Sequence, residues 1–225
     1  MTSVFCDVET IPEQPEEEAK AQIAETIKPP ATMKKEETIA DWHSGAGKYA
    51  GAKDKAIDDE YRKGSFDGAK GQICSIAMAV EDNNVISWAT DSGDDSKIIT
   101  AFFNHLRHKL KGRPPYFIGH YIGGFDLKFI FHRAVINKIQ PPFELPFSGR
   151  HGTHFYDNMI AWAGYKDRIS QDNLCKALGI EGKPGDICGA NVLDHYRAGG
   201  IDRIEEYNAH DVEQAREIYK RLNFL

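Results

Sequence analysis

The sequence lacks the features of a membrane-spanning or disulfide-stabilised protein. None of its apolar runs approaches the length of a bilayer crossing, and its first residues lack the basic-then-apolar pattern of a signal peptide. We therefore expect the chain in the cytoplasm, with no membrane partner. Its four cysteines are far apart in the sequence with no CxxC spacing (Cys6, Cys74, Cys175 and Cys188). This spacing favours reduced thiols over a disulfide framework or a zinc site.

The chain also lacks an excess of positive charge. Its formal net charge of −6 argues against a protein that holds nucleic acid by bulk electrostatics. It does not exclude an enzyme whose acidic pocket carries bound cations, because such ions reverse the local sign of the charge. With 225 residues, 41% of them hydrophobic and 28% charged, the chain has the composition of an ordinary globular protein. That length suits one domain with a substantial core, or at most two small ones.

The first quarter of the chain combines one clear strand with a long polar stretch. A strand is predicted over Val4 to Pro12. Residues 13–70 are then rich in charge, glycine, alanine and proline, and no apolar stripe is sustained long enough for a core element. We interpret 13–70 as a charged surface insertion into a single domain that covers residues 1–225.

The rest of the chain alternates strand and helix patterns. A hairpin is predicted from two strand patterns, at 71–82 and 85–90. Helical spacing and end signals predict helices over 94–110, 125–138, 172–180 and 201–222. A short strand is predicted at 115–120, and a strand that leads into a helix at 154–164. This order predicts an α/β fold with a mixed central β-sheet flanked by helices.

Two acids lie inside the first strand, in the segment VFCDVETIP. Side chains two apart in a strand share a face, so Asp7 and Glu9 point the same way while Cys6 and Val8 face the opposite layer. Adjacent carboxylates repel each other, and burying either one unpaired is costly. No nearby lysine or arginine compensates for them, which indicates that something else supplies positive charge.

Two further acids stand in unusual positions. Asp126 follows two glycines at the start of an apolar helix, and Asp211 interrupts the apolar stripe of the last helix, on the same face as Tyr207. Taken singly, each has an ordinary explanation as a helix cap or a solvated residue. Four carboxylates brought together make a hard, oxygen-rich site that suits Mg²⁺ or Mn²⁺. Two such ions can support phosphodiester hydrolysis.

Three motifs, in this order, resemble those of a known family: DVE at 7–9, GHYIGGFD at 119–126 and YNAHD at 207–211. They are similar to the motifs of the DEDD 3′–5′ exonucleases of the RNase H-like superfamily. The resemblance is closest to stand-alone exonucleases of phages and prophages that are related to the proofreading domain of family-B DNA polymerases. It covers nearly the whole chain outside 13–70, and it implies the cytoplasm of a bacterial or phage-infected cell.

The resemblance implies roles for five residues. Asp7, Glu9, Asp126 and Asp211 would bind two Mg²⁺ or Mn²⁺ ions, and Tyr207, at the position that marks the tyrosine-type branch, would orient the attacking water. The chain departs from the family at one place, because Tyr121 stands where the second motif has asparagine. Candidate substrate contacts are Thr10, Phe125 near a terminal base, and Arg150 in a glycine-flanked loop.

The sequence therefore predicts a metal-dependent 3′–5′ exonuclease. Single-stranded DNA is favoured as substrate because a terminal strand must reach the metals. The alternatives are an RNA 3′-exonuclease and a non-catalytic nucleic-acid-binding module; the retention of all four acids and the tyrosine argues against the second. A separate polymerase, or another replication or repair protein, is a candidate partner.

Overall fold

A computed structural model describes residues 1–182 and 185–225 of the chain. The strands within these residues are β1 (Thr2–Pro12), β2 (Gly71–Val80), β3 (Ile86–Ala89), β4 (Pro115–Gly119) and β5 (Phe155–Asp157). The α-helices are α1 (Glu16–Thr26), α2 (Glu36–Ser44), α3 (Ala52–Lys63), α4 (Ser96–Leu110), α5 (Asp126–Ile136), α6 (Asn158–Ala163), α7 (Gln171–Leu178), α8 (Val192–Arg197) and α9 (Ile201–Leu222). Two 3₁₀ turns, η1 (Gly47–Tyr49) and η2 (Gly64–Phe66), flank α3.

The strands form one mixed sheet in the order β3-β2-β1-β4-β5. Strand β1 pairs antiparallel with β2 and parallel with β4, while β5 extends the parallel part. The predicted hairpin is confirmed as the antiparallel pair β2 and β3. The predicted first strand and the four predicted helices are confirmed as well, with ends shifted by a few residues.

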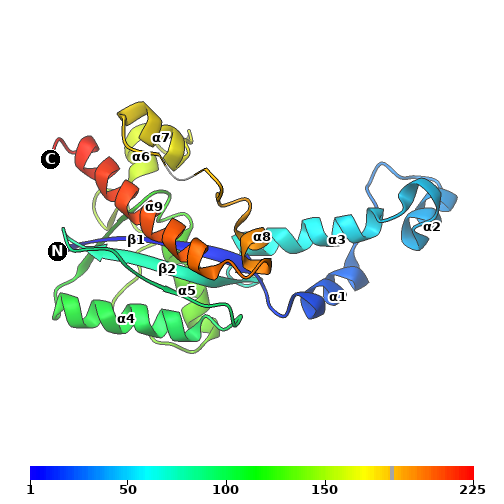
Figure 1. The fold of residues 1–225 in the computed structure, drawn as a ribbon, viewed down its shortest axis with the longest axis horizontal. Coiled ribbons are helices and arrows are strands. Elements are labelled where there is room, and N and C mark those ends of the chain that lie inside the picture. The colour runs from blue at the N-terminus through cyan, green and yellow to red at the C-terminus, as the bar shows by residue number, and fades with distance from the viewer. Residues whose placement is uncertain (183–184) are drawn as a thin grey trace.

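Helices cover both faces of this sheet (Figure 1). On one face, Cys6 and Val8 of β1 pack in a core with apolar residues of α4 and α5. On the other face, Phe5 packs with Val212 of α9. The alternation of side chains along β1 therefore has the period predicted from the sequence. It leaves Asp7 and Glu9 on the α9 side, with Cys6 and Val8 opposite.

The sequence shows no apolar stripe in residues 13–70 that would predict a core element, and this expectation is wrong because the structure buries several of their side chains. Helices α1, α2 and α3 form an arm, defined here as residues 16–63, that projects from one end of the sheet (Figure 1). Tyr61 of α3 is 2% exposed and packs beside Ile11 of β1, and Trp42 of α2 is buried as well. The apolar residues of these helices are too sparse to form a recognisable stripe. Ion pairs also attach the helices to the rest of the chain.

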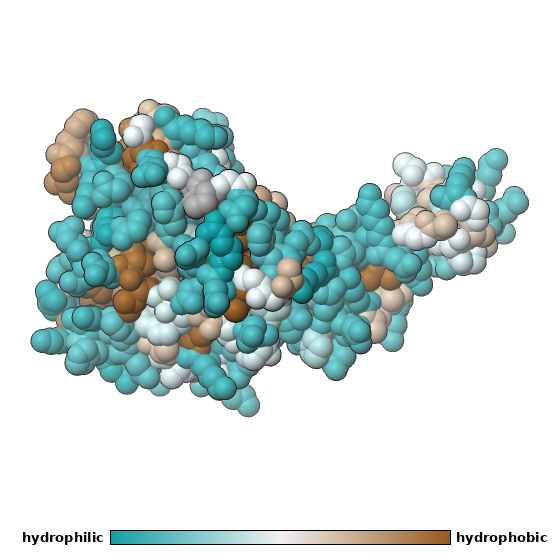
Figure 2. All heavy atoms as spheres, viewed as in Figure 1, coloured by the Kyte–Doolittle hydropathy of each residue, from teal (hydrophilic) through white to brown (hydrophobic). Residues whose placement is uncertain are grey.

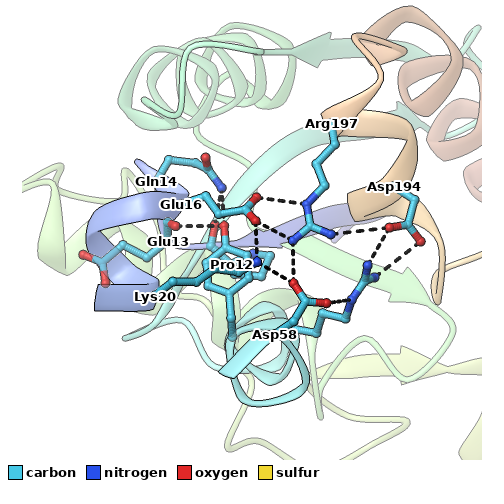
Figure 3. A network of polar contacts seen from close by, with 10 residues as sticks. Pro12, Glu13, Gln14, Glu16, Lys20, Asp58, Asp194 and Arg197 are labelled. Carbon is cyan, nitrogen blue, oxygen red and sulfur yellow. Dashed lines mark hydrogen bonds and ion pairs between the residues drawn. The ribbon is translucent and has the colours of Figure 1, made fainter. Parts of the chain in front are cut away.

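These ion pairs fasten the base of the arm to α8 (Figure 3). The guanidinium of Arg197 lies 2.6 Å from a carboxylate oxygen of Glu16 in α1 and 2.9 Å from one of Asp58 in α3. Lys20 bridges the same two acids at 2.8 and 2.6 Å. Burial alone would raise the pKa of Asp58, but hydrogen bonds from Lys20, Arg62 and Arg197 outweigh it and lower that pKa. The Asp58 carboxylate is therefore ionised at neutral pH.

Hydrophilic residues cover most of the face shown in Figure 2, along the arm as well as over the sheet. Among the helices that the structure describes, none combines the length and apolar character that a bilayer crossing requires. All four cysteines are free, and Cys188 is the exposed one. The free thiols agree with the sequence, which favours reduced cysteines.

Candidate active site

The first two acids of the site come from the second half of β1. Asp7 pairs with Ala77 of β2 and Glu9 with Ser75, and the register then shifts between Glu9 and Thr10. Such an irregularity bends a strand and changes the direction of the side chains around it. Strand geometry alone places the carboxylates of Asp7 and Glu9 on one face. Their negative charge therefore has to be compensated from the helical layer that covers this face.

That layer is α9, which brings in a third carboxylate. Each of Asp7, Glu9 and Asp211 offers one oxygen, and these three atoms lie within 4.8 Å of one another. Glu9 and Asp211 are buried, and Asp7 is half-buried. Like charges this close repel strongly, and a bound cation could compensate for this repulsion. Three carboxylate donors of this kind fit a hard divalent ion such as Mg²⁺ or Mn²⁺.

The fourth acid, Asp126, begins α5 directly below β1. Its Oδ1 accepts a hydrogen bond of 3.1 Å from the backbone N–H of Val8, the residue between Asp7 and Glu9. Burial raises the pKa of Asp126 to about 8; the charges of Asp157 and Asp211 add to this effect, and backbone hydrogen bonds oppose it. Asp126 is thus fixed next to the cluster, although its oxygens are not among the three that converge.

Tyr207 lies one turn before Asp211 on the same face of α9 and is 5% exposed. Burial raises the pKa of its phenol well above the usual range, and the negative charges of Asp211, Glu9 and Asp7 raise it further. The hydroxyl therefore keeps its proton at neutral pH. It can donate a hydrogen bond beside the carboxylates.

Two buried amides hold the acids in place, and neither was predicted from the sequence. The Asn208 side chain donates to Oδ2 of Asp7 at 2.7 Å and accepts from the Ser75 hydroxyl at 2.9 Å. The Gln171 amide donates to Oδ1 and to the backbone oxygen of Asp211, each at 3.0 Å. Asn208 could have been found, because it lies three residues before Asp211 on one helix face. Gln171 carries no such local signal.

Tyr121, which departs from the family pattern, has a positive φ of 60°. Its backbone N–H donates to Asp157 at 3.0 Å. The Arg168 guanidinium lies 4.5 Å from the centre of the Tyr121 ring and donates to its hydroxyl at 3.2 Å. The ring also lies over Gly124, where an added Cβ would come within 2.3 Å of it. Tyr121 therefore fills the space above the glycine turn that leads to Asp126.

The three predicted substrate contacts lie in different places. Thr10 follows Glu9 and donates its hydroxyl to the Ser65 carbonyl at 2.6 Å. Phe125 is half-buried at the start of α5, with its ring 5.5 Å from that of Phe129. Arg150 is exposed in the turn before β5, where its backbone N–H donates to the His154 ring.

The strand register separates Arg150 from the acids. Strands β1, β4 and β5 are parallel, and Phe155, the first residue of β5, pairs with Phe117, which in turn pairs with Val4. The acids lie beyond Val4 toward the carboxyl end of β1. The structure thus groups Thr10 and Phe125 with the acids and places Arg150 in a turn that enters the sheet from its other end.

Comparison with protein families identifies the chain. A family described as a predicted 3′–5′ exonuclease related to the exonuclease domain of PolB matches residues 69–225. The chain belongs to this family. The matched range includes Asp126, Tyr207 and Asp211. Asp7 and Glu9 precede this range, and they lie on β1, which pairs with β2 inside it. No curated protein matches the chain.

A solved structure with a similar fold is the family B DNA polymerase from the hyperthermophilic archaeon Pyrobaculum calidifontis. The TM-score is 0.55 at 14% identity, and the match covers 69% of this chain and 22% of the polymerase chain. The chain therefore spans less than a quarter of that polymerase. Together with the mixed sheet between two helical layers, this likeness confirms the RNase H-like α/β fold predicted from the sequence.

Proposed function

We propose that this protein is a metal-dependent 3′–5′ exonuclease that hydrolyses single-stranded DNA from its 3′ end. The observation that carries the proposal is the convergence of Asp7, Glu9 and Asp211 within 4.8 Å. A family assignment alone would be compatible with a degenerate site. The retained carboxylates, with Asp126 and Tyr207 beside them, support an enzyme over a binding module.

Asp7, Glu9 and Asp211 are the residues that would hold one divalent ion, and Asp7 with Asp126 would hold a second. When bound, such ions supply an activated water and neutralise the negative charge that develops on the departing 3′ oxygen. Mg²⁺ and Mn²⁺ are the candidates, since both prefer oxygen donors.

The residues around the acids would position the reactants. The protonated Tyr207 hydroxyl can orient the attacking water by a hydrogen bond, which is a task for a neutral phenol. Asn208 and Gln171 fix the carboxylates of Asp7 and Asp211, so the donor oxygens keep their orientation before any ligand arrives. Prior fixation of this kind lowers the reorganisation needed at the moment of reaction.

The test is a time course on a 5′-labelled single-stranded DNA oligonucleotide, with Mg²⁺, Mn²⁺ or EDTA. The variants are Asp7→Ala and, as a matched control, Asp91→Ala, which removes an exposed carboxylate in the turn before α4. We expect a descending ladder with wild type and Asp91→Ala that requires metal and disappears with Asp7→Ala.

Other outcomes would redirect the proposal. Digestion of RNA but not DNA would replace DNA as the substrate. Hydrolysis retained in Asp7→Ala, or unchanged in EDTA, would refute the site assignment. Binding of DNA and RNA without digestion of either would establish a binding module instead. Because the family is related to a polymerase domain, a separate polymerase, or another replication or repair protein, is the partner that we propose to test in pull-down experiments.

A further inference from the structure

An aromatic side chain stands exposed where the insertion returns to the sheet. Phe66, the last residue of η2, is 73% exposed. It lines a cavity of about 320 Å³ between η2 and the start of α5, at the small end of the ~300–1,000 Å³ range of ligand pockets. Its lining also includes Asp67, Gly68, Phe125, Lys128 and His132.

Two chain neighbours connect this cavity to the site carboxylates, which do not themselves line it. Phe125 in its wall directly precedes Asp126. On the other side, Thr10 follows Glu9, and its hydroxyl donates to the carbonyl of Ser65, the neighbour of Phe66. A nucleotide whose phosphate lies at the acids would therefore have this cavity within reach.

The wall that carries Phe66 is firmly held. The backbone N–H of Asp67 donates to Gly64 at 3.0 Å, and that of Lys70 donates to Asp67 at 2.8 Å. Gly68 packs so tightly on α5 that an added Cβ would lie 2.7 Å from the Cβ of His132. Because these contacts hold the turn in place, the Phe66 ring is presented to solvent by a rigid segment. A rigid aromatic surface loses little conformational entropy when a ligand stacks on it.

The charges around the cavity set the direction of a bound strand. The Asp67 carboxylate accepts from the N–H of Ala69 at 3.0 Å and would repel a phosphate on the η2 side. Lys128 is exposed on the α5 side and would attract one. A nucleotide would thus place its base against Phe66 and its phosphate toward α5 and the acids. Aromatic stacking with nearby positive charge is the common basis of single-strand binding.

We propose that Phe66 is a substrate-positioning residue, on which the nucleobase of the 3′-terminal nucleotide stacks in the cavity shared with Phe125. The inference rests on the proposed function and extends it, because it gives the end of the 13–70 insertion a part in binding the substrate. Stacking of this kind is independent of base identity, since every base has an aromatic face.

The experiment measures binding of a 5′-fluorescein single-stranded DNA oligonucleotide to the full chain by fluorescence anisotropy in EDTA. Two oligonucleotides are compared, one with a normal 3′-terminal nucleotide and one with an abasic analogue there. The variants are Phe66→Ala, Phe66→Trp as the conservative replacement, and Phe224→Ala as control, since Phe224 is also exposed, at 97%, and lies at the end of the chain.

For the normal oligonucleotide, Phe66→Ala should weaken binding about 5- to 100-fold, the equivalent of one lost base stack. Phe66→Trp and Phe224→Ala should bind like wild type. For the abasic oligonucleotide, Phe66→Ala should bind no worse than wild type. Thermal midpoints should agree among all variants because the ring is exposed; should Phe66→Ala unfold, Phe66→Gln takes its place.

Several results would overturn the inference. If Phe66→Ala lost the same affinity for both oligonucleotides, Phe66 would not act through the terminal base. If its affinity for the normal oligonucleotide were unchanged, Phe66 would have no role in binding. These results are distinct from a failure of the proposed function. If wild type digests DNA and Phe66→Ala behaves like it, only the inference falls; if wild type neither binds nor digests DNA, the substrate itself is refuted.

Discussion

Replacing Asp7 by asparagine should stabilise the metal-free protein while abolishing hydrolysis. Asp7, Glu9 and Asp211 offer oxygens within 4.8 Å of one another. Two unit charges at that distance repel by about 3.5 kcal/mol at an effective dielectric constant of ~20. Hydration of the half-buried Asp7 and the hydrogen bond from Asn208 offset part of this repulsion. Since asparagine retains an oxygen that can accept from Asn208, we expect a net gain of roughly 1–2 kcal/mol in the free energy of unfolding.

Urea unfolding measures this gain. In EDTA, the midpoint of Asp7→Asn should exceed that of wild type at an unchanged m-value, whereas Asp91→Asn, a surface control, should shift the free energy of unfolding by less than ~0.5 kcal/mol. Saturating Mg²⁺ or Mn²⁺ should then reverse the order. An ion present at 100 times its dissociation constant adds about 2.7 kcal/mol to the wild type, and the variant should gain far less.

Two results would refute this reasoning. A variant less stable than wild type in EDTA would show that the carboxylates do not repel in the folded state. Equal stabilisation of both proteins by metal would show that the ion binds away from Asp7. Either result would require a different explanation for the convergence of acids from β1 and α9.

Further predictions concern the groups around the site. In the metal-free protein, Asp126 has its pKa raised to about 8, so the folded state binds more protons than the unfolded state between pH ~4 and 8. Stability should therefore fall as pH rises through that window, and Asp126→Asn should flatten the profile; an equally steep profile in the variant would contradict the assignment. Asn208→Leu removes the amide that orients Asp7 and should weaken Mn²⁺ binding about 10- to 100-fold by calorimetric titration, with an unchanged affinity as the opposing result. Arg133→Met leaves the Asp95 carboxylate, 1% exposed, without its ion pair and should destabilise the fold by about 3–5 kcal/mol in urea unfolding. Adding Asp95→Asn should recover part of this loss; no recovery would show that the cost comes from packing.

Local periodicity explains why much of the site could be predicted. The alternation of side chains in a strand already places Asp7 and Glu9 on one face, and the helical repeat places Tyr207 and Asp211 on another. Neither conclusion requires knowledge of the neighbours. The same periodicity failed for residues 13–70, where Tyr61 is buried although its helix shows no sustained apolar stripe. Its partners, such as Arg197 in the ion-pair network around it, are distant in the sequence.

The sequence by itself thus determined most strands and helices outside residues 13–70, the shared faces of Asp7 with Glu9 and of Tyr207 with Asp211, and the family resemblance carried by three short motifs. Only the tertiary structure decided how these faces meet. The hydrogen bond from Asn208 to Asp7 spans 201 residues, and that from Val8 to Asp126 spans 118. The tertiary structure also decided that Phe66 and Phe125 line one cavity, although their segments are far apart in the chain. Side-chain periods act over a few residues, whereas contacts of this kind depend on how the layers pack, and a single sequence does not encode that packing in any local pattern.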